Sequence, residues 1–334
     1  MMRTNESRNG GSRAGWMTFA IILSVSAVLA YLYFRQVGSP RLAERIELHE
    51  QIMRGTADAP YRYRVLVPFL GEGITRMLDA ALPGDRAFLF AYALYDLAAI
   101  LFLLGSLHRY LRAWFSNEQA LVGVLFAAAA MPMALRDHYF QPWSILEAGL
   151  FTAGLICIRG GRHRLLALVV ALASLNRETG IFIPLAFLIA APRANGGDDP
   201  RRPSRKKAAL LLAGYTAIWA AAFFGLRLVL GEAPSVETVG GLLAKNTIGP
   251  ALLRTAVHVA LLFGAFWIFA AAGFRRAPAF VKRTALLVPP YLVVVILWGI
   301  WYEVRLLLPL NAIVIPLGLS FLYRERGAVS PPEP

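Results

Sequence analysis

The sequence LLALVVALASL-NRET-GIFIPLAFLIAA, residues 165–191, sets the fold of the chain. Four polar residues, Asn176 to Thr179, interrupt two oily stretches. A charged side chain at membrane depth costs about 2.5–3.5 kcal/mol, so it persists mainly where it faces a protein interior or a water-filled cavity. Arg177 and Glu178 are therefore predicted to belong to a functional site. The alternative is an Arg177–Glu178 pair that only ties helices together.

The composition is typical of an integral membrane protein, with 57% hydrophobic and 16% charged residues. Spanning a bilayer takes roughly 20 apolar residues. The expected long spans are 16–34, 87–107, 120–134, 142–158, 208–230, 251–272, 285–301 and 306–323. The pieces 165–175 and 181–192 are too short to span alone. The chain is thus expected to form one all-α polytopic domain, 1–334, with about ten membrane segments, two of them short.

Basic residues predict the orientation, because cytoplasmic loops collect Lys and Arg. With the N-terminus inside, the whole formal net charge of +14 falls on one side of the membrane. The inside segments are 1–15, 108–119, 159–164, 193–207, 274–284 and 324–334. We therefore expect a multi-pass protein of the inner (plasma) membrane with both termini cytoplasmic. The basic residues are scattered over short loops without an aromatic-interleaved patch, which argues against nucleic-acid binding.

Both flanks of residues 165–192 are basic, which predicts a hairpin that rises from the cytoplasm and turns at Asn176–Gly180. Residues 193–207 form a basic cytoplasmic linker, and residues 35–86 form the long first outer loop. The stretch 41–52 alternates apolar and charged residues at roughly helical spacing, which predicts a helix lying on the membrane surface.

Candidate site residues cluster on the expected outer side. Glu44, Glu47 and Glu50 stand three apart on one side of the surface helix, although a solvated face would look the same. Arg62 and Arg64 alternate with tyrosines; guanidinium groups bind phosphate oxygens in pairs. The alternative there is an interfacial belt with snorkelling arginines.

Three further acids carry separate expectations. Asp137, beside His138, is a candidate acid/base or metal ligand. Glu303 and Arg305 again place an acid and a base at the mouth of a helix. Asp96 lies alone in an apolar span, so it must pair with a basic group or be protonated.

The pattern resembles the GT-C class of membrane glycosyltransferases, and looks closest to a small bacterial branch of it. The resemblance rests on four places and on the whole-chain plan of a long first outer loop, a short broken hairpin and many spans. The four places are Pro60-Tyr-Arg-Tyr-Arg-Val-Leu-Val-Pro68, Asp137 to Glu147, Leu175-Asn-Arg-Glu-Thr179, and Glu303-Val-Arg305 with Pro309.

The resemblance implies inverting transfer of a sugar from a polyprenyl-phosphate donor to a cell-envelope acceptor on the outer face. The class usually carries its catalytic acid early in the first outer loop. Residues 35–43 contain no acid, so Glu44 or Glu47 is expected in that role. The residues expected to hold the substrates and the lipid phosphate are Arg62, Arg64, Asn176, Arg177, Glu178, Glu303 and Arg305.

Asp137 is expected to orient the acceptor or to bind a divalent cation, which some members of the class use; the sequence does not identify a cofactor. The expected partners are the lipid-linked donor, membrane lipids and a protein of an envelope complex that helps to recognise the acceptor. In two rival functions the same residues do not catalyse a reaction. One is a transporter or flippase for a lipid-linked sugar, and the other is a catalytically silent subunit of an envelope assembly complex.

Overall fold

The computed structural model describes residues 6–82, 84–135, 142–191, 203–247, 250–300 and 303–323. This part of the chain is helical throughout and contains no strand, apart from an isolated bridge between Ala59 and Ser235. The expectation of an all-α protein is therefore confirmed.

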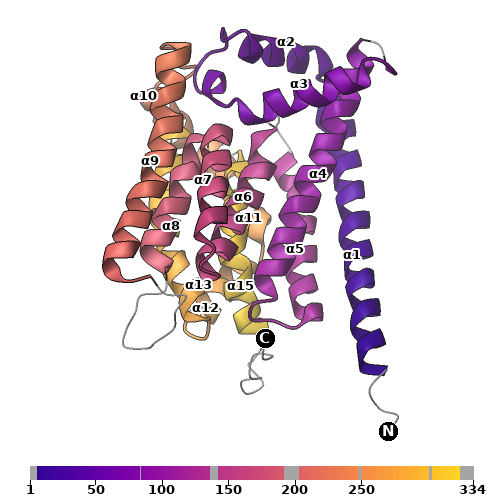
Figure 1. Cartoon of the computed structure of the whole chain (residues 1–334), viewed down its shortest axis with the longest axis vertical. Coiled ribbons are helices and arrows are strands. Elements are labelled where there is room, and N and C mark those ends of the chain that lie inside the picture. The colour runs from indigo at the N-terminus through magenta and orange to yellow at the C-terminus, as the bar shows by residue number, and fades with distance from the viewer. Residues whose placement is uncertain are drawn as a thin grey trace.

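The longer helices form the body of the molecule (Figure 1). They are α1 (Glu6–Tyr33), α4 (Asp85–Leu111), α5 (Asn117–Leu135), α6 (Trp143–Arg159), α7 (His163–Asn176), α9 (Arg205–Leu230), α11 (Pro250–Phe263), α14 (Val288–Trp298) and α15 (Asn311–Leu322). The shorter helices are α2 (Leu42–Met53), α3 (Leu66–Leu78), α8 (Phe182–Ala190), α10 (Val239–Thr247), α12 (Phe266–Gly273) and α13 (Ala279–Thr284). A π-helical turn, η1 (Phe34–Gly38), follows α1, and short 3-10 turns are η2 (Tyr61–Tyr63), η3 (Glu178–Ile181), η4 (Ala285–Leu287) and η5 (Val304–Leu310).

Several of these helices are long and apolar enough to cross a membrane. Within the described residues there are five, or up to six if the pair Leu252–Phe263 and Phe266–Gly273, bent by 67°, counts as one span. The five are Gly15–Gly38, Asp85–Leu111, Arg205–Leu230, Ala279–Trp298 and Val304–Leu322. The chain is thus a helical membrane protein. The expected count of ten segments exceeds the number of helices that meet this length and composition, and the expected span 251–272 is broken near Gly264.

The predicted hairpin is present. Helix α7 ends at Asn176, Arg177 adopts an extended conformation (φ −158°, ψ 154°), and η3 leads into α8. The two helices run antiparallel, because the ring of His163 at the start of α7 lies 6.1 Å from the ring of Phe187 near the end of α8. A Cβ atom on Gly180 would lie 2.9 Å from the backbone of Ala173. Only glycine lets the turn pack this closely against α7.

Helices α2 and α3 lie across the upper end of the bundle in Figure 1, whereas α1 begins and α15 ends at the lower end. As predicted, α2 is amphipathic: Glu44, Glu47 and Glu50 are exposed, and His49 is buried. Arg45, however, points inward rather than toward these glutamates.

Asp96 on α4 has a basic neighbour, which is one of the two outcomes expected for an acid in an apolar span. Arg45 Nη2 lies 3.9 Å from Asp96 Oδ2, and both side chains are buried. The guanidinium also lies over the ring of Tyr92. A Cβ atom on Gly38 would lie 2.6 Å from Arg45 Nη1, so this glycine leaves room for the arginine. These contacts dock α2 on α4.

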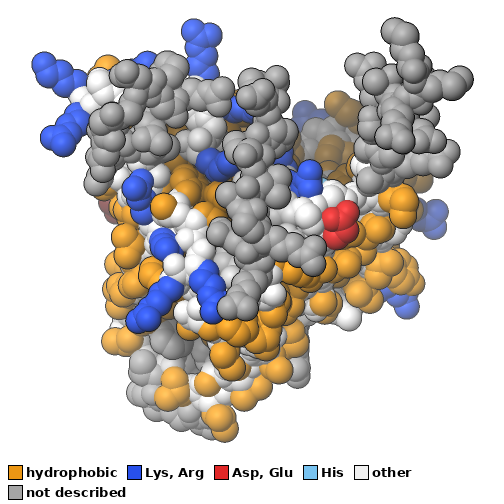
Figure 2. Space-filling model, turned by 90° about the horizontal axis from the view of Figure 1, so that it is seen from below, with side chains coloured by type: hydrophobic (Ala, Val, Ile, Leu, Met, Phe, Trp, Pro, Cys, Tyr) orange, Lys and Arg blue, Asp and Glu red, His pale blue; other side chains and the backbone are white. Residues whose placement is uncertain are grey.

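The lower end of the bundle is basic. Figure 2 views the lower end, where Lys and Arg side chains predominate over Asp and Glu among the described residues. The first outer loop and residues 203–207 lie at opposite ends. This separation agrees with the arrangement expected from the charge rule, in which the basic end faces the cytoplasm.

The orientation can be tested with single cysteines in a Cys157→Ala background. Ser39 at the upper end and Lys206 at the lower end are both exposed. We expect a membrane-impermeant thiol reagent to label Ser39→Cys in intact cells and Lys206→Cys only after permeabilisation. Labelling of both positions in denatured protein is the control, and labelling of Lys206→Cys in intact cells would contradict the orientation.

Candidate functional site

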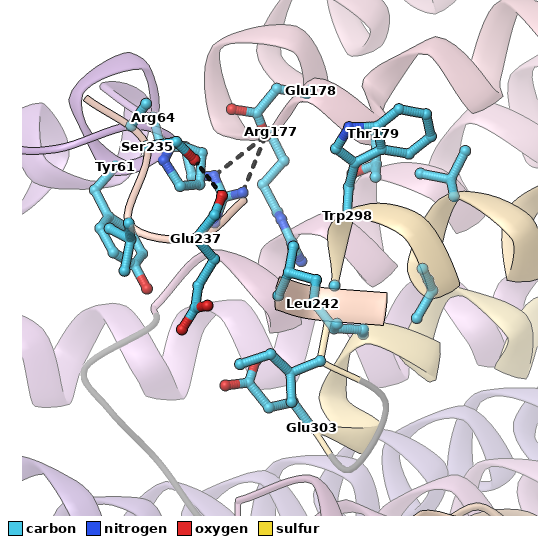
Figure 3. Close-up of a pocket in the computed structure, with 18 of the residues that line it drawn as sticks. Tyr61, Arg64, Arg177, Glu178, Thr179, Ser235, Glu237, Leu242, Trp298 and Glu303 are labelled. Atoms are coloured by element: carbon cyan, nitrogen blue, oxygen red, sulfur yellow. Dashed lines mark hydrogen bonds and ion pairs between the residues drawn. The ribbon is translucent and has the colours of Figure 1, made fainter. Parts of the chain in front are cut away.

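A cavity of about 1300 Å³ opens among the segment 59–64, the α7–α8 turn and helices α9, α10 and α14. Its walls are largely apolar and aromatic. Their large side chains are Phe182, Trp219, Phe223, Tyr291 and Trp298. Binding sites for small molecules are usually concave and apolar, with a few convergent polar groups. This cavity has such groups where the α7–α8 turn meets the segment 59–64 (Figure 3).

Arg64 and Glu178 form the first polar pair of the cavity. Arg64 donates from Nε and Nη2 to Glu178 Oε2 at 3.2 and 3.1 Å. The guanidinium also lies 5.7 Å from the ring centre of Tyr61 and 5.8 Å from that of Trp143. Burial lowers the pKa of Arg64 from its usual value, an effect that Glu178 opposes. The arginine is therefore held in a defined orientation at the cavity wall.

Arg177 and Glu147 form the second pair. Arg177 Nη1 donates to Glu147 Oε2 at 2.5 Å, and each side chain is 8% exposed. The hydroxyl of Thr179 donates to the other oxygen of Glu147. Trp219 on α9 donates to the backbone carbonyl of Glu178 at 2.9 Å. Helices α6 and α9 thus fix the turn from two sides.

The Arg177–Glu178 pair considered from the sequence does not form, because each residue has a distant counter-ion. Arg177 binds Glu147 of α6 and Glu178 binds Arg64, yet both side chains line the cavity. In the described part of the chain, Arg177 Nε and Glu178 Oε1 are buried without a hydrogen-bond partner. A buried unsatisfied polar atom costs about 1–3 kcal/mol. Because these two atoms have almost no accessible surface, they add to the cost of burying the two pairs and are not contacts that the cavity offers to a ligand.

The acids expected to serve as the base occupy different places. Glu44 lines the cavity and forms an exposed ion pair with Arg41 at 2.9 Å. Glu47 is exposed and accepts a hydrogen bond from Gln51, but it is not among the lining residues. The geometry therefore separates these two candidates. Asp137 lies outside the described residues.

The expected arginine cluster is only partly assembled. Arg64 and Arg177 line the cavity, whereas Arg62 donates to the backbone carbonyls of Ala57, Leu230 and Glu232. Arg305 is buried beside Glu303, to which it donates a hydrogen bond. Of these two, Glu303 reaches the cavity.

Asn176 has a supporting place behind the site. It is fully buried and donates to the backbone carbonyl of Trp143 at 3.1 Å. Trp143 in turn donates from its ring nitrogen to the carbonyl of Arg64 at 2.9 Å. Asn176 and Trp143 therefore link the α7–α8 turn to the segment that contains Arg64.

Residues 231–247 were not singled out from the sequence, yet they contribute Ser235, Glu237, Thr238 and Lys245 to the cavity. Their connection to the first loop comes from the backbone. Ala59 N donates to Pro234 O at 2.9 Å, and Val236 N donates to Ala59 O at 3.1 Å. The available signal was a polar stretch on the expected outer side, directly after the apolar run that ends at residue 230.

No group of three or more His, Cys, Asp or Glu side chains that could hold a metal ion occurs in the described ranges. Comparison of the chain with known protein families, with curated proteins and with solved structures finds no match. Function is therefore inferred from the residues that line the cavity and from the motifs of the sequence.

The buried Arg177–Glu147 pair gives a stability prediction. Glu147→Gln leaves a buried guanidinium without its counter-ion, which is expected to destabilise the folded protein by about 3–5 kcal/mol. Glu50→Gln breaks the exposed pair with Arg54 and should cost no more than about 1 kcal/mol. Thermal unfolding in detergent measures both. If both substitutions have the same small effect on stability, the Arg177–Glu147 pair does not hold the fold together.

Proposed function

We propose that the chain is a membrane glycosyltransferase of the GT-C type, with ten membrane segments of which two are short. It would transfer a sugar from a polyprenyl-phosphate donor to a cell-envelope acceptor on the outer face. The observation that carries the proposal is the composition of the cavity, where aromatic and aliphatic walls continue into a charged end formed by Arg64, Arg177 and Glu178. A polyprenyl phosphate is likewise divided into a long apolar chain and a charged phosphate group.

The charged end suits a phosphate group. Guanidinium groups form short, paired hydrogen bonds with phosphate oxygens. Arg64 is oriented by Tyr61 and Glu178, and Arg177 by Glu147, so little ordering is needed when an anion binds. The same groups would stabilise the negative charge that develops on the leaving phosphate.

The apolar walls suit the lipid. Trp219 and Phe223 project from α9 and Trp298 from α14, and all three line the same cavity. Both helices belong to membrane spans, so an isoprenoid chain could enter at the depth of the hydrocarbon. Burial of apolar surface contributes about 25 cal/mol per Å², which makes this contact the main source of affinity for a long chain.

Glu44 would act as the base, because it lines the cavity and Glu47 does not. Its carboxylate would take the proton of the acceptor hydroxyl as that oxygen attacks the anomeric carbon. The bond from the anomeric carbon to the phosphate oxygen breaks, and the polyprenyl phosphate leaves with the electron pair. Attack opposite the leaving group inverts the anomeric centre. Glu44 comes from α2, whose position is set by the Arg45–Asp96 contact.

A direct test measures sugar transfer and release in nanodiscs with a panel of radiolabelled polyprenyl-phosphate hexoses and pentoses. Glu44→Gln is expected to lower turnover by roughly 10²–10⁴-fold, because a general base contributes about that much. Donor binding should be unchanged. Glu47→Gln on the same helix is the matched control and should keep full turnover. Full turnover in Glu44→Gln would show that Glu44 is not the base. If the unmodified protein binds the donor but neither transfers nor releases its sugar, the result favours the flippase.

Phosphate recognition is tested separately by Arg64→Lys, which retains the charge but loses the planar pair of donors. The Kd for polyprenyl phosphate, measured by microscale thermophoresis in detergent, is expected to rise roughly tenfold or more. Arg54→Lys, at an exposed position outside the cavity, should bind as tightly as the unmodified protein. Unchanged affinity in Arg64→Lys would indicate that the arginine serves only as an interfacial anchor.

A further inference from the structure

A second, smaller pocket of about 230 Å³ lies where α4 and α6 end. Arg109 and Arg112 come from the end of α4, and Arg159 and Arg162 come from the end of α6 and the turn that follows. Tyr110, Ala113, Ile156 and Gly160 complete its lining. The pocket shares no lining residue with the large cavity.

The charge rule alone does not explain this arrangement. It requires basic residues at the cytoplasmic end of each span, but not that four of them surround one hollow. Here the turn after α6 reverses the chain, with Gly161 at φ +63°. A Cβ atom on Gly160 would lie 3.2 Å from Ile156 O and 3.6 Å from the side chain of Arg162. The two glycines thus allow Arg162 to fold back toward the pocket.

The pocket has an excess of positive charge. Among the described residues, none of the four guanidinium groups forms an ion pair with a carboxylate within 4.0 Å. Glu118, the acid whose charge interacts with Arg112, accepts a hydrogen bond from the Ser116 hydroxyl instead. Blue side chains predominate on this face in Figure 2. An anion bound here would meet several donors without a competing carboxylate.

One of the four arginines is also held by an aromatic stack. The Arg159 guanidinium lies 5.0 Å from the ring centre of Trp114. Trp114 is stacked on Phe280 of α13, with 6.0 Å between the ring centres. Holding a cation over an aromatic ring reduces the rotamer freedom that binding would otherwise remove. The pocket is therefore partly organised before a ligand arrives.

We propose that this pocket binds the phosphate group of an anionic membrane lipid. Four guanidinium groups provide enough donors for the oxygens of a phosphodiester, and arginine matches the geometry of that group. The pocket opens at the ends of α4 and α6, and α4 is long and apolar enough to cross a membrane, so its end would lie near the lipid headgroups. Basic pockets between helices at the cytoplasmic side are typical sites for such headgroups. Inorganic phosphate has the same chemistry and is the other source of the anion.

The test uses the full chain purified in detergent. Phosphatidylglycerol or cardiolipin is titrated against phosphatidylcholine, and bound lipid is counted by native mass spectrometry while unfolding is followed thermally. Arg112→Gln/Arg162→Gln should weaken anionic-lipid binding by roughly tenfold or more, since each basic group near the headgroups contributes to attraction. The matched control, Arg275→Gln/Arg276→Gln, removes the same charge from two exposed residues of another turn and should bind like the unmodified protein.

Each outcome decides the question. Loss of binding confined to Arg112→Gln/Arg162→Gln supports the pocket. Equal loss in both double variants overturns it, because the lipid would then be attracted by diffuse surface charge; unchanged binding in both also overturns it. Inorganic phosphate is titrated in parallel. A stabilisation by phosphate that equals that by lipid, and that the pocket variant loses, identifies the free anion as the ligand; stabilisation by lipid alone identifies the headgroup.

Discussion

The extended backbone at Arg177 is the constraint on which the site depends. In an extended segment, successive side chains point to opposite sides, whereas in a helix they would diverge by only about 100°. Arg177 and Glu178 can therefore take counter-ions from different parts of the chain, Glu147 on α6 and Arg64 between η2 and α3. Gly180 makes the turn possible by its close approach to α7.

Buried ion pairs seldom stabilise a fold, because desolvation of two charges offsets much of their attraction. The main effect of the two pairs here is to position the two arginine side chains. Glu147 aligns Arg177, and Glu178 aligns Arg64. Arg177 Nε and Glu178 Oε1 are buried without a hydrogen-bond partner in the described structure. Removing one member would thus change both the fold and the electrostatics of the cavity.

One wall of the cavity is built from two segments that are far apart in the sequence. The segment 57–63 is joined to residues 230–236 through Arg62, through Tyr63 and through backbone hydrogen bonds around Ala59. Arg62 therefore organises the wall of the site from outside the cavity. Arg45 has a similar task, since its contact with Asp96 holds α2, and with it Glu44, over the bundle.

The sequence by itself determined the helical membrane class, the hairpin at 165–191, the amphipathic helix after residue 41 and the need of Asp96 either for a basic neighbour or for a proton. Each follows from local rules: hydrophobic run length, charge bias, helical spacing and the cost of a buried charge. The tertiary structure decided which charges meet. It paired Arg177 with Glu147 rather than with Glu178, set Arg62 against backbone carbonyls, placed Glu44 but not Glu47 at the cavity, and brought residues 231–247 beside the first loop. These contacts join residues that are far apart in the chain, so they depend on how the helices pack, which no local pattern specifies.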